Sequence, residues 1–130
     1  MAYTTISKAT DYFNTKTYSG NSSTQNITGI GFQPDMVWTK KRDGTDDHNI
    51  FDAVRGVTKE VRPNKSDTED TATNGLTAFG TDGYTIGDWG LMNQGHTYVS
   101  WNWRAGAGAG SSNTDGSINT TSTSVNTTSG

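Results

Sequence analysis

The clearest alternation of apolar and polar residues lies at positions 95–106, which read GHTYVSWNWRAG. Val99, Trp101 and Trp103 stand two residues apart, and side chains at that spacing point to the same side of an extended strand. Two large indoles in register need a deep apolar layer beneath them. The segment therefore predicts a central strand, with these three residues on the face that packs against the core.

Short apolar segments separated by turn signals fill most of the chain before this strand. Asp-Gly and Asn-Gly pairs begin at positions 43, 74, 82 and 115, and such pairs favour tight turns because both residues tolerate positive φ angles. Many short strands without alternating helices predict an all-β fold, an antiparallel β-sandwich or jelly roll. The strands that we predict lie near 12–18, 24–30, 35–41, 49–54, 58–62, 76–79, 84–86 and 96–104.

The longest helical candidate, 57–73, is interrupted by Pro63 and is mostly polar, so we predict a strand and a solvated loop there. In the predicted strand 35–41, Met36 and Trp38 share one face, and we assign both to the core. We also assign Trp38, Trp101 and Trp103 to the core. Truncation of any of the three to alanine is then expected to cost about 3–5 kcal/mol.

Composition narrows the class of protein. The 130 residues have room for one domain. Only 29% of them are hydrophobic, a low fraction that is also found in disordered chains. The small net charge of −3 and the 13 aromatic residues (4 Trp, 5 Tyr, 4 Phe) nevertheless favour a compact polar β domain. The absence of cysteine excludes disulfides and thiolate metal sites. Basic residues form no stripe beyond 40–42, so we expect no nucleic-acid partner. We also expect neither membrane insertion nor secretion by the usual signal route.

The composition changes after Ala105 and divides the chain into a β-sandwich domain, 1–105, and a C-terminal segment, 106–130. The segment opens with a Gly/Ala hinge and continues with Asn, Ser and Thr, among which only Ile118 and Val125 offer apolar anchors. One interpretation is a flexible tail. The other is an assembly arm that adds as a strand to an open sheet edge of a neighbouring copy.

Five segments resemble a family of β domains of unannotated biochemistry that is found in tail-fibre and other virion proteins of tailed, often aquatic, bacteriophages. They read YFNTKTYSGN (12–21), ITGIGFQPDMVW (27–38), FDAVRGV (51–57), DGYTIG (82–87) and YVSWNWRAG (98–106). The resemblance implies a concanavalin A-like jelly roll and a place on a virion or extracellular fibre. Similar proteins usually continue into another β repeat where this chain stops, so we expect a single unit to gain length by self-association.

Few residues suggest a catalytic, cofactor-binding or metal-binding role. The two histidines and two glutamates form no acid–base pattern, and no nucleophile motif occurs, so we assign no catalytic, cofactor-binding or metal-binding residue and expect no enzyme. His96, at the start of the predicted strand 96–104, is interpreted as a partly buried structural histidine. Asp43, Asp46, Asp47 and His48 form an acidic loop, for which solvation is favoured over calcium binding. We expect Arg55 to pair with Asp52 or Asp35, and Arg104 to form a similar ion pair.

The candidate glycan contact is Trp89, flanked by Asp88 and Asn93 in a glycine-bounded loop. Carbohydrate sites combine an aromatic platform with such polar neighbours. The alternative for Trp89 is a lid folded over the sandwich.

The leading hypothesis is a non-enzymatic structural subunit of a phage fibre, virion or related filament. Its expected partners are copies of itself, and other virion proteins are further candidates. The alternative is a lectin-like domain that binds host-surface glycans.

Overall fold

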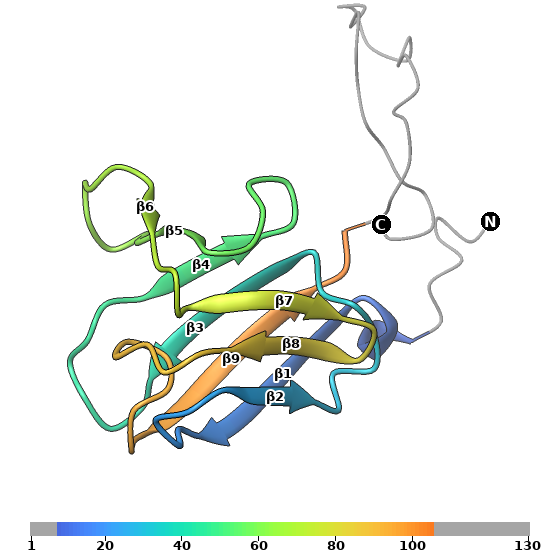
Figure 1. Cartoon of the computed structure of the whole chain (residues 1–130). Helices are drawn as coiled ribbons and strands as arrows, with labels where there is room; N and C mark the ends of the chain where they lie inside the picture. The colour runs from blue at the N-terminus through green and yellow to red at the C-terminus, as the bar shows by residue number, and fades with distance from the viewer. Residues whose placement is uncertain (1–7, 106–130) are drawn as a thin grey trace, which may run out of the picture.

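The computed structural model describes residues 8–105, which form two antiparallel sheets and one short 3-10 helix (Figure 1). The elements are η1 (Ala9–Asp11), β1 (Phe13–Ser19), β2 (Gln25–Thr28), β3 (Met36–Lys41), β4 (Asn49–Asp52), β5 (Lys59–Val61), β6 (Asp70–Thr71), β7 (Leu76–Gly80), β8 (Gly83–Ile86) and β9 (Thr97–Trp103). All eight predicted strands are confirmed to within a few residues. The C-terminal segment, with Ile118 and Val125, lies outside the described residues.

The larger sheet has the strand order β1-β9-β3-β4-β5-β6, and the smaller has the order β2-β8-β7. Strand β9 pairs with β1 on one side and β3 on the other, which confirms its central position. Trp101 lies between Thr15 of β1 and Trp38 of β3. Trp103 lies in the next row, between Phe13 and Met36.

Apolar residues from both sheets fill the space between them, as expected of a β-sandwich. The smaller sheet contributes Ile27, Leu76, Tyr84 and Ile86, and the connecting loops contribute further apolar side chains. From the larger sheet come Val37 and Phe51, both fully buried.

The assignment of tryptophans to this core is wrong. On β9 the buried residues are Tyr98, Ser100 and Asn102, whereas Trp101 and Trp103 are partly exposed on the opposite face. On β3, likewise, Val37 and Thr39 are buried and Met36 and Trp38 are not. Alternation identifies which residues share a face, but it does not decide which face turns inward.

Polar residues occupy part of the inner face of the larger sheet. Thr39, Asn49, Ser100 and Asn102 are all fully buried there. The amide of Asn102 donates hydrogen bonds to the Asn14 carbonyl at 3.0 Å and to Ser100 Oγ at 3.1 Å. The larger sheet therefore turns several polar side chains inward and its three tryptophans outward.

Candidate functional site

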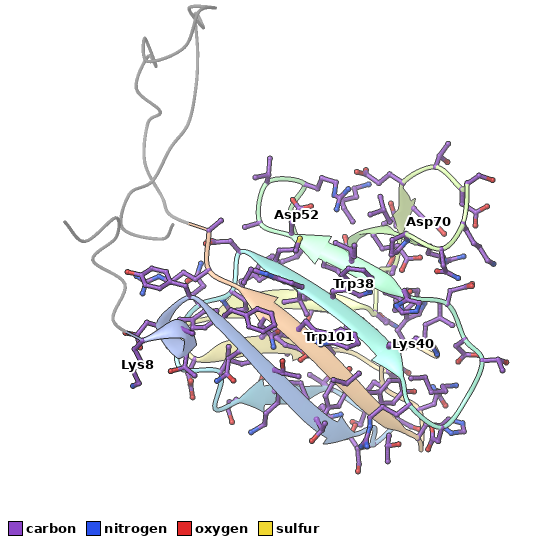
Figure 2. All side chains as sticks on the ribbon, turned by 180° about the vertical axis from the view of Figure 1, so that it is seen from behind. Lys8, Trp38, Lys40, Asp52, Asp70 and Trp101 are labelled. Carbon is purple, nitrogen blue, oxygen red and sulfur yellow. The ribbon has the colours of Figure 1, made fainter. Side chains whose placement is uncertain are left out.

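The outward-facing tryptophans form the most distinctive surface of the described residues. Trp38, Trp101 and Trp103 line an open groove of about 260 Å³. Figure 2 shows Trp38 and Trp101 side by side on the face of the larger sheet that is turned away from the smaller one. Their ring centroids lie 6.0 Å apart with the planes at 65°, an edge-to-face contact that is favourable for aromatic pairs.

Further apolar side chains extend this surface across four strands. Phe13 is 37% exposed, and its ring centroid lies 5.0 Å from that of Trp103. Ile50 of β4 pairs with Trp38 and is partly exposed. The outer aromatic face, as we call it, consists of Phe13, Met36, Trp38, Ile50, Trp101 and Trp103.

His48 holds the indole of Trp38 in place. The Trp38 Nε1–H donates to His48 Nδ1 at 2.9 Å, and the His48 backbone N–H donates to Asn64 Oδ1 at 3.1 Å. The indole N–H is thereby satisfied within the protein, and the ring is positioned for apolar contact. Such a face suits burial against another molecule rather than proton transfer, because aromatic side chains supply large, well-ordered contact area.

Trp89 lies elsewhere, against the core. Its ring is partly buried and makes an edge-to-face contact with Phe51 at a centroid distance of 6.0 Å. This is the position that the lid interpretation gives it. Asp88 accepts a hydrogen bond from the Asn74 amide at 2.8 Å.

Asn93 is fully buried and bonded to its own chain, so it is a structural residue rather than a free ligand contact. Its amide donates to the Gly87 carbonyl at 2.7 Å and to the Ser23 carbonyl. Its Oδ1 accepts from the Asn21 backbone N–H at 3.0 Å and from the Gln25 side chain. These bonds connect Asn93 to Gly87 in its own loop, to the loop after β1 and to the first residue of β2.

Two carboxylates of the acidic loop form ion pairs within the protein. Asp46 pairs with Lys41, while Asp47 pairs with Lys65 at 2.8 Å. Lys65 and Asn64 hold the pKa of Asp47 below its usual range. Across residues 8–105, no three His, Asp or Glu side chains are placed to hold a metal ion together.

The expectations for the other structural residues have different outcomes. Arg55 pairs with Asp52, with 2.5 Å between Nη2 and Oδ2, which confirms that expectation. The expected partial burial of His96 is wrong, because the residue is exposed, with its Nδ1 3.4 Å from Asp43 Oδ1. The described part of the chain gives Arg104 no acidic partner; its guanidinium lies 5.9 Å from the ring centroid of Tyr12 instead.

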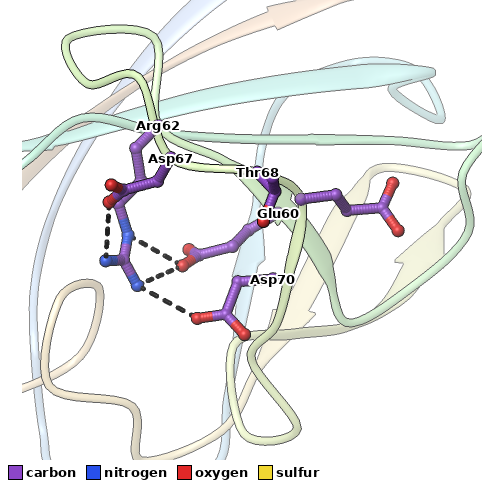
Figure 3. A pocket seen from close by; sticks show the side chains of 6 residues that line it. Glu60, Arg62, Asp67, Thr68 and Asp70 are labelled. Atoms are coloured by element: carbon purple, nitrogen blue, oxygen red, sulfur yellow. Dashed lines mark hydrogen bonds and ion pairs between the residues drawn. The ribbon is translucent and has the colours of Figure 1, made fainter.

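A second pocket, of about 290 Å³, lies beside β5 and β6 and contains four acidic side chains and one arginine (Figure 3). Arg62 Nε donates to Oε1 of the fully buried Glu60 at 2.9 Å, and its Nη atoms lie 3.8 Å from Asp67 and 3.5 Å from Asp70. Burial raises the pKa of Glu60, and the contact with Arg62 offsets only part of this. Arg62 thus fastens the β5–β6 hairpin.

The buried Glu60 predicts a pH effect on stability. Because its pKa is raised in the folded protein, the folded state holds the proton more tightly than the unfolded chain, so stability is lost as pH rises from the ordinary glutamate range through the raised value. In Glu60→Gln we expect this loss to disappear. Urea unfolding at a series of pH values measures it, with exposed Glu69→Gln from the same pocket as the control. Equal pH slopes in both variants would contradict the assignment.

Sequence reasoning missed the outer aromatic face because it placed the indoles inside. It also passed over Phe13, Ile50 and the exposed Val54, which no alternation pattern distinguishes from core residues. The pairing of Trp38 with Trp101 appears only in the structure, so the sequence held no signal that this face is external.

Comparison with known proteins gives one match, to a family model. The chain matches no curated protein and no solved structure. Within residues 8–105, no helix has the length and apolar character needed to cross a membrane. The family model described as a domain of unknown function, DUF7483, matches residues 8–130, and the chain therefore belongs to the DUF7483 family.

Proposed function

We propose that this protein is a non-enzymatic structural subunit of a phage fibre, virion or related extracellular filament, and that its copies associate through the outer aromatic face. The observation that carries the proposal is that face itself, with three partly exposed tryptophans in one groove. The sandwich already has a separate core between its sheets. The outer face is a second apolar surface beside this core, and the exposed part of its side chains can contact a partner.

Contact composition favours another protein surface as that partner. Aromatic residues and methionine are enriched in the buried centre of protein interfaces, and contiguous exposed apolar patches on soluble domains often mark such sites. The face spans strands β1, β9, β3 and β4, so it is wide enough for packing between sheets. A concanavalin A-like jelly-roll topology is part of the same proposal.

Two of the four sheet edges, β1 and β7, have features that disfavour association. Lys16 on the edge strand β1 pairs with the inward-facing Ser100, which places a charge toward the inner side of the edge. Edge strand β7 has a register shift between Leu76 and Ala78. Inward charges and bulges are features that discourage the addition of a strand. These features favour face contacts in the sandwich, and the proposed C-terminal arm is a separate contribution.

No catalytic role is needed for the titratable groups of the described region. His48 accepts the indole N–H of Trp38, and Glu60 accepts from Arg62. Both arrangements have a structural explanation, which supports a non-enzymatic assignment.

Light scattering and negative-stain electron microscopy of the intact chain and of a 107–130 deletion test the proposal. We expect defined oligomers or filaments from the intact chain. Their persistence in the deletion variant would assign association to the sandwich, and their loss would assign it to the arm. Monomers in both preparations would contradict self-association.

Glycan binding is the second candidate, and the partly exposed indoles of Trp101 and Trp103 favour it because aromatic rings stack on sugar rings. The groove is lined by tryptophans alone, whereas specific small-ligand sites also place polar groups around the ligand. This favours the structural role. A glycan array with wild type, Trp101→Ala and the control Trp89→Phe separates the two. Sugar binding lost only in Trp101→Ala would support the lectin role, and blank arrays for all three would count against it.

A further inference from the structure

The turn between β4 and β5 exposes an apolar side chain almost completely. Val54 is 97% exposed, the highest value among the large exposed hydrophobic residues of the described chain, and Val57 in the same turn is 41% exposed. Figure 1 shows the β4–β5 connection looping out beyond the end of β4. An apolar side chain at the tip of a projecting turn is well placed to enter another surface.

The turn is held in one conformation by Asp52. Its Oδ1 accepts hydrogen bonds from the backbone N–H groups of Val54 at 3.0 Å and Arg55 at 2.8 Å. The Gly56 N–H donates to the Asp52 carbonyl at 3.0 Å, and Gly56 has a φ angle of +94°, which favours glycine. The Val54 tip is therefore pre-organised, and little conformational entropy is lost when a partner binds it.

The charges at the turn balance. Arg55 and Asp52 form a close ion pair, so the turn carries no net charge from these two residues. An uncompensated charge would be costly to bury in an apolar groove, and this turn brings none. An apolar, pre-organised and locally neutral tip suits a groove lined by aromatic rings.

Such a groove lies on the same chain, in the outer aromatic face. We infer that the Val54 turn of one copy inserts into the groove between Trp38, Trp101 and Trp103 of the next copy. This inference rests on the proposed self-association and specifies its contact. The groove, at about 260 Å³, has room for an aliphatic side chain and part of its turn.

The position of the two surfaces determines the kind of assembly. The groove lies on the sheet face, whereas the turn that Asp52 begins projects at the end of β4, as Figure 2 shows for Asp52, Trp38 and Trp101. Tip and groove are different surfaces, so each copy offers one of each. Such a contact generates rings or open filaments when it is made in one direction, and a two-fold dimer when two copies insert their tips into each other's grooves.

Complementary variants test the inference. Val54→Asp removes the tip and leaves the groove intact, whereas Trp101→Lys removes the groove and leaves the tip intact. We expect each variant alone to associate at least roughly thirtyfold more weakly than wild type, the scale of an interface hot spot. Mixed in equal amounts, the two should form dimers with one copy of each, which sedimentation velocity detects. Circular dichroism and urea unfolding establish that each variant is folded.

Three results would overturn the inference. If Val54→Asp assembles like wild type while Trp101→Lys does not, the tip is not the occupant and the proposed function stands. If both variants are monomeric alone and also when mixed, the Val54 tip does not enter the groove. If neither substitution changes the assembly, both the inference and the outer aromatic face as the contact fail.

Discussion

Trp101→Lys is expected to weaken self-association by roughly a hundredfold or more. Trp101 lies at the centre of the outer aromatic face, beside Trp38 and in the groove. The substitution removes a large indole and places an ammonium group where the partner must bury it without an opposite charge, and both changes disfavour the complex. Sedimentation equilibrium of the variant and of wild type measures the difference in association constant.

The matched control is Thr28→Lys. Thr28 is exposed on β2 in the smaller sheet, so this variant gains the same charge away from the outer aromatic face. We expect it to associate like wild type. Equal weakening by the two substitutions would indicate an effect of net charge alone, and an unchanged Trp101→Lys would exclude the face as the contact.

Phe51→Ala is expected to lower the free energy of unfolding by about 3–5 kcal/mol, because it leaves a cavity in the core. Phe51 is fully buried, contacts Trp89 and sits among residues of both sheets. Trp101→Ala should cost less than this in the monomer, since part of the indole is already in water. Urea unfolding at concentrations where both variants are monomeric compares them.

This comparison also tests which face of β9 is internal. If Trp101→Ala costs as much as Phe51→Ala, the indole belongs to a folding core and is not reserved for a partner. The expected cost for Trp101 is below the one predicted from the sequence, which assigned Trp38, Trp101 and Trp103 to the core. The smaller cost follows from exposure and not from residue size.

The strands were predictable because their signals are local. Asp82-Gly83 connects β7 to β8, and the alternation in 95–106 matches β9 closely. Strand β6, with only Asp70 and Thr71, was missed because it has no apolar alternation and lies in a polar segment. It is held by pairing with β5 instead, a contact that no local pattern reveals.

The direction of each strand face was not predictable, because it depends on what the other sheet brings. Tyr98, Ser100 and Asn102 look like surface residues beside two tryptophans, yet they turn inward. Tyr98 stacks on Tyr18 at a centroid distance of 5.3 Å, and Asn102 bonds to β1. These long-range contacts make a polar strand face compatible with burial.

The candidate glycan site was not predictable for the same reason, because the environment of its residues depends on tertiary contacts. Trp89, Asp88 and Asn93 lie close together in the sequence and resemble a sugar-binding site. In the structure, Trp89 packs on Phe51, and the side chain of Asn93 is fully hydrogen-bonded within the protein. Val54 lies between Ala53 and Arg55 in the sequence, which does not indicate its exposure; the conformation of its turn exposes it. Loop environments of this kind are set by tertiary contacts.

Sedimentation velocity of the intact protein over a wide range of concentration, with iodide quenching of tryptophan fluorescence on the same samples, tests the central claim most directly. We expect species larger than the monomer, with quenching that falls as they form because the outer tryptophans become covered. A protein that remains monomeric throughout, with its tryptophans equally accessible at every concentration, would contradict the account.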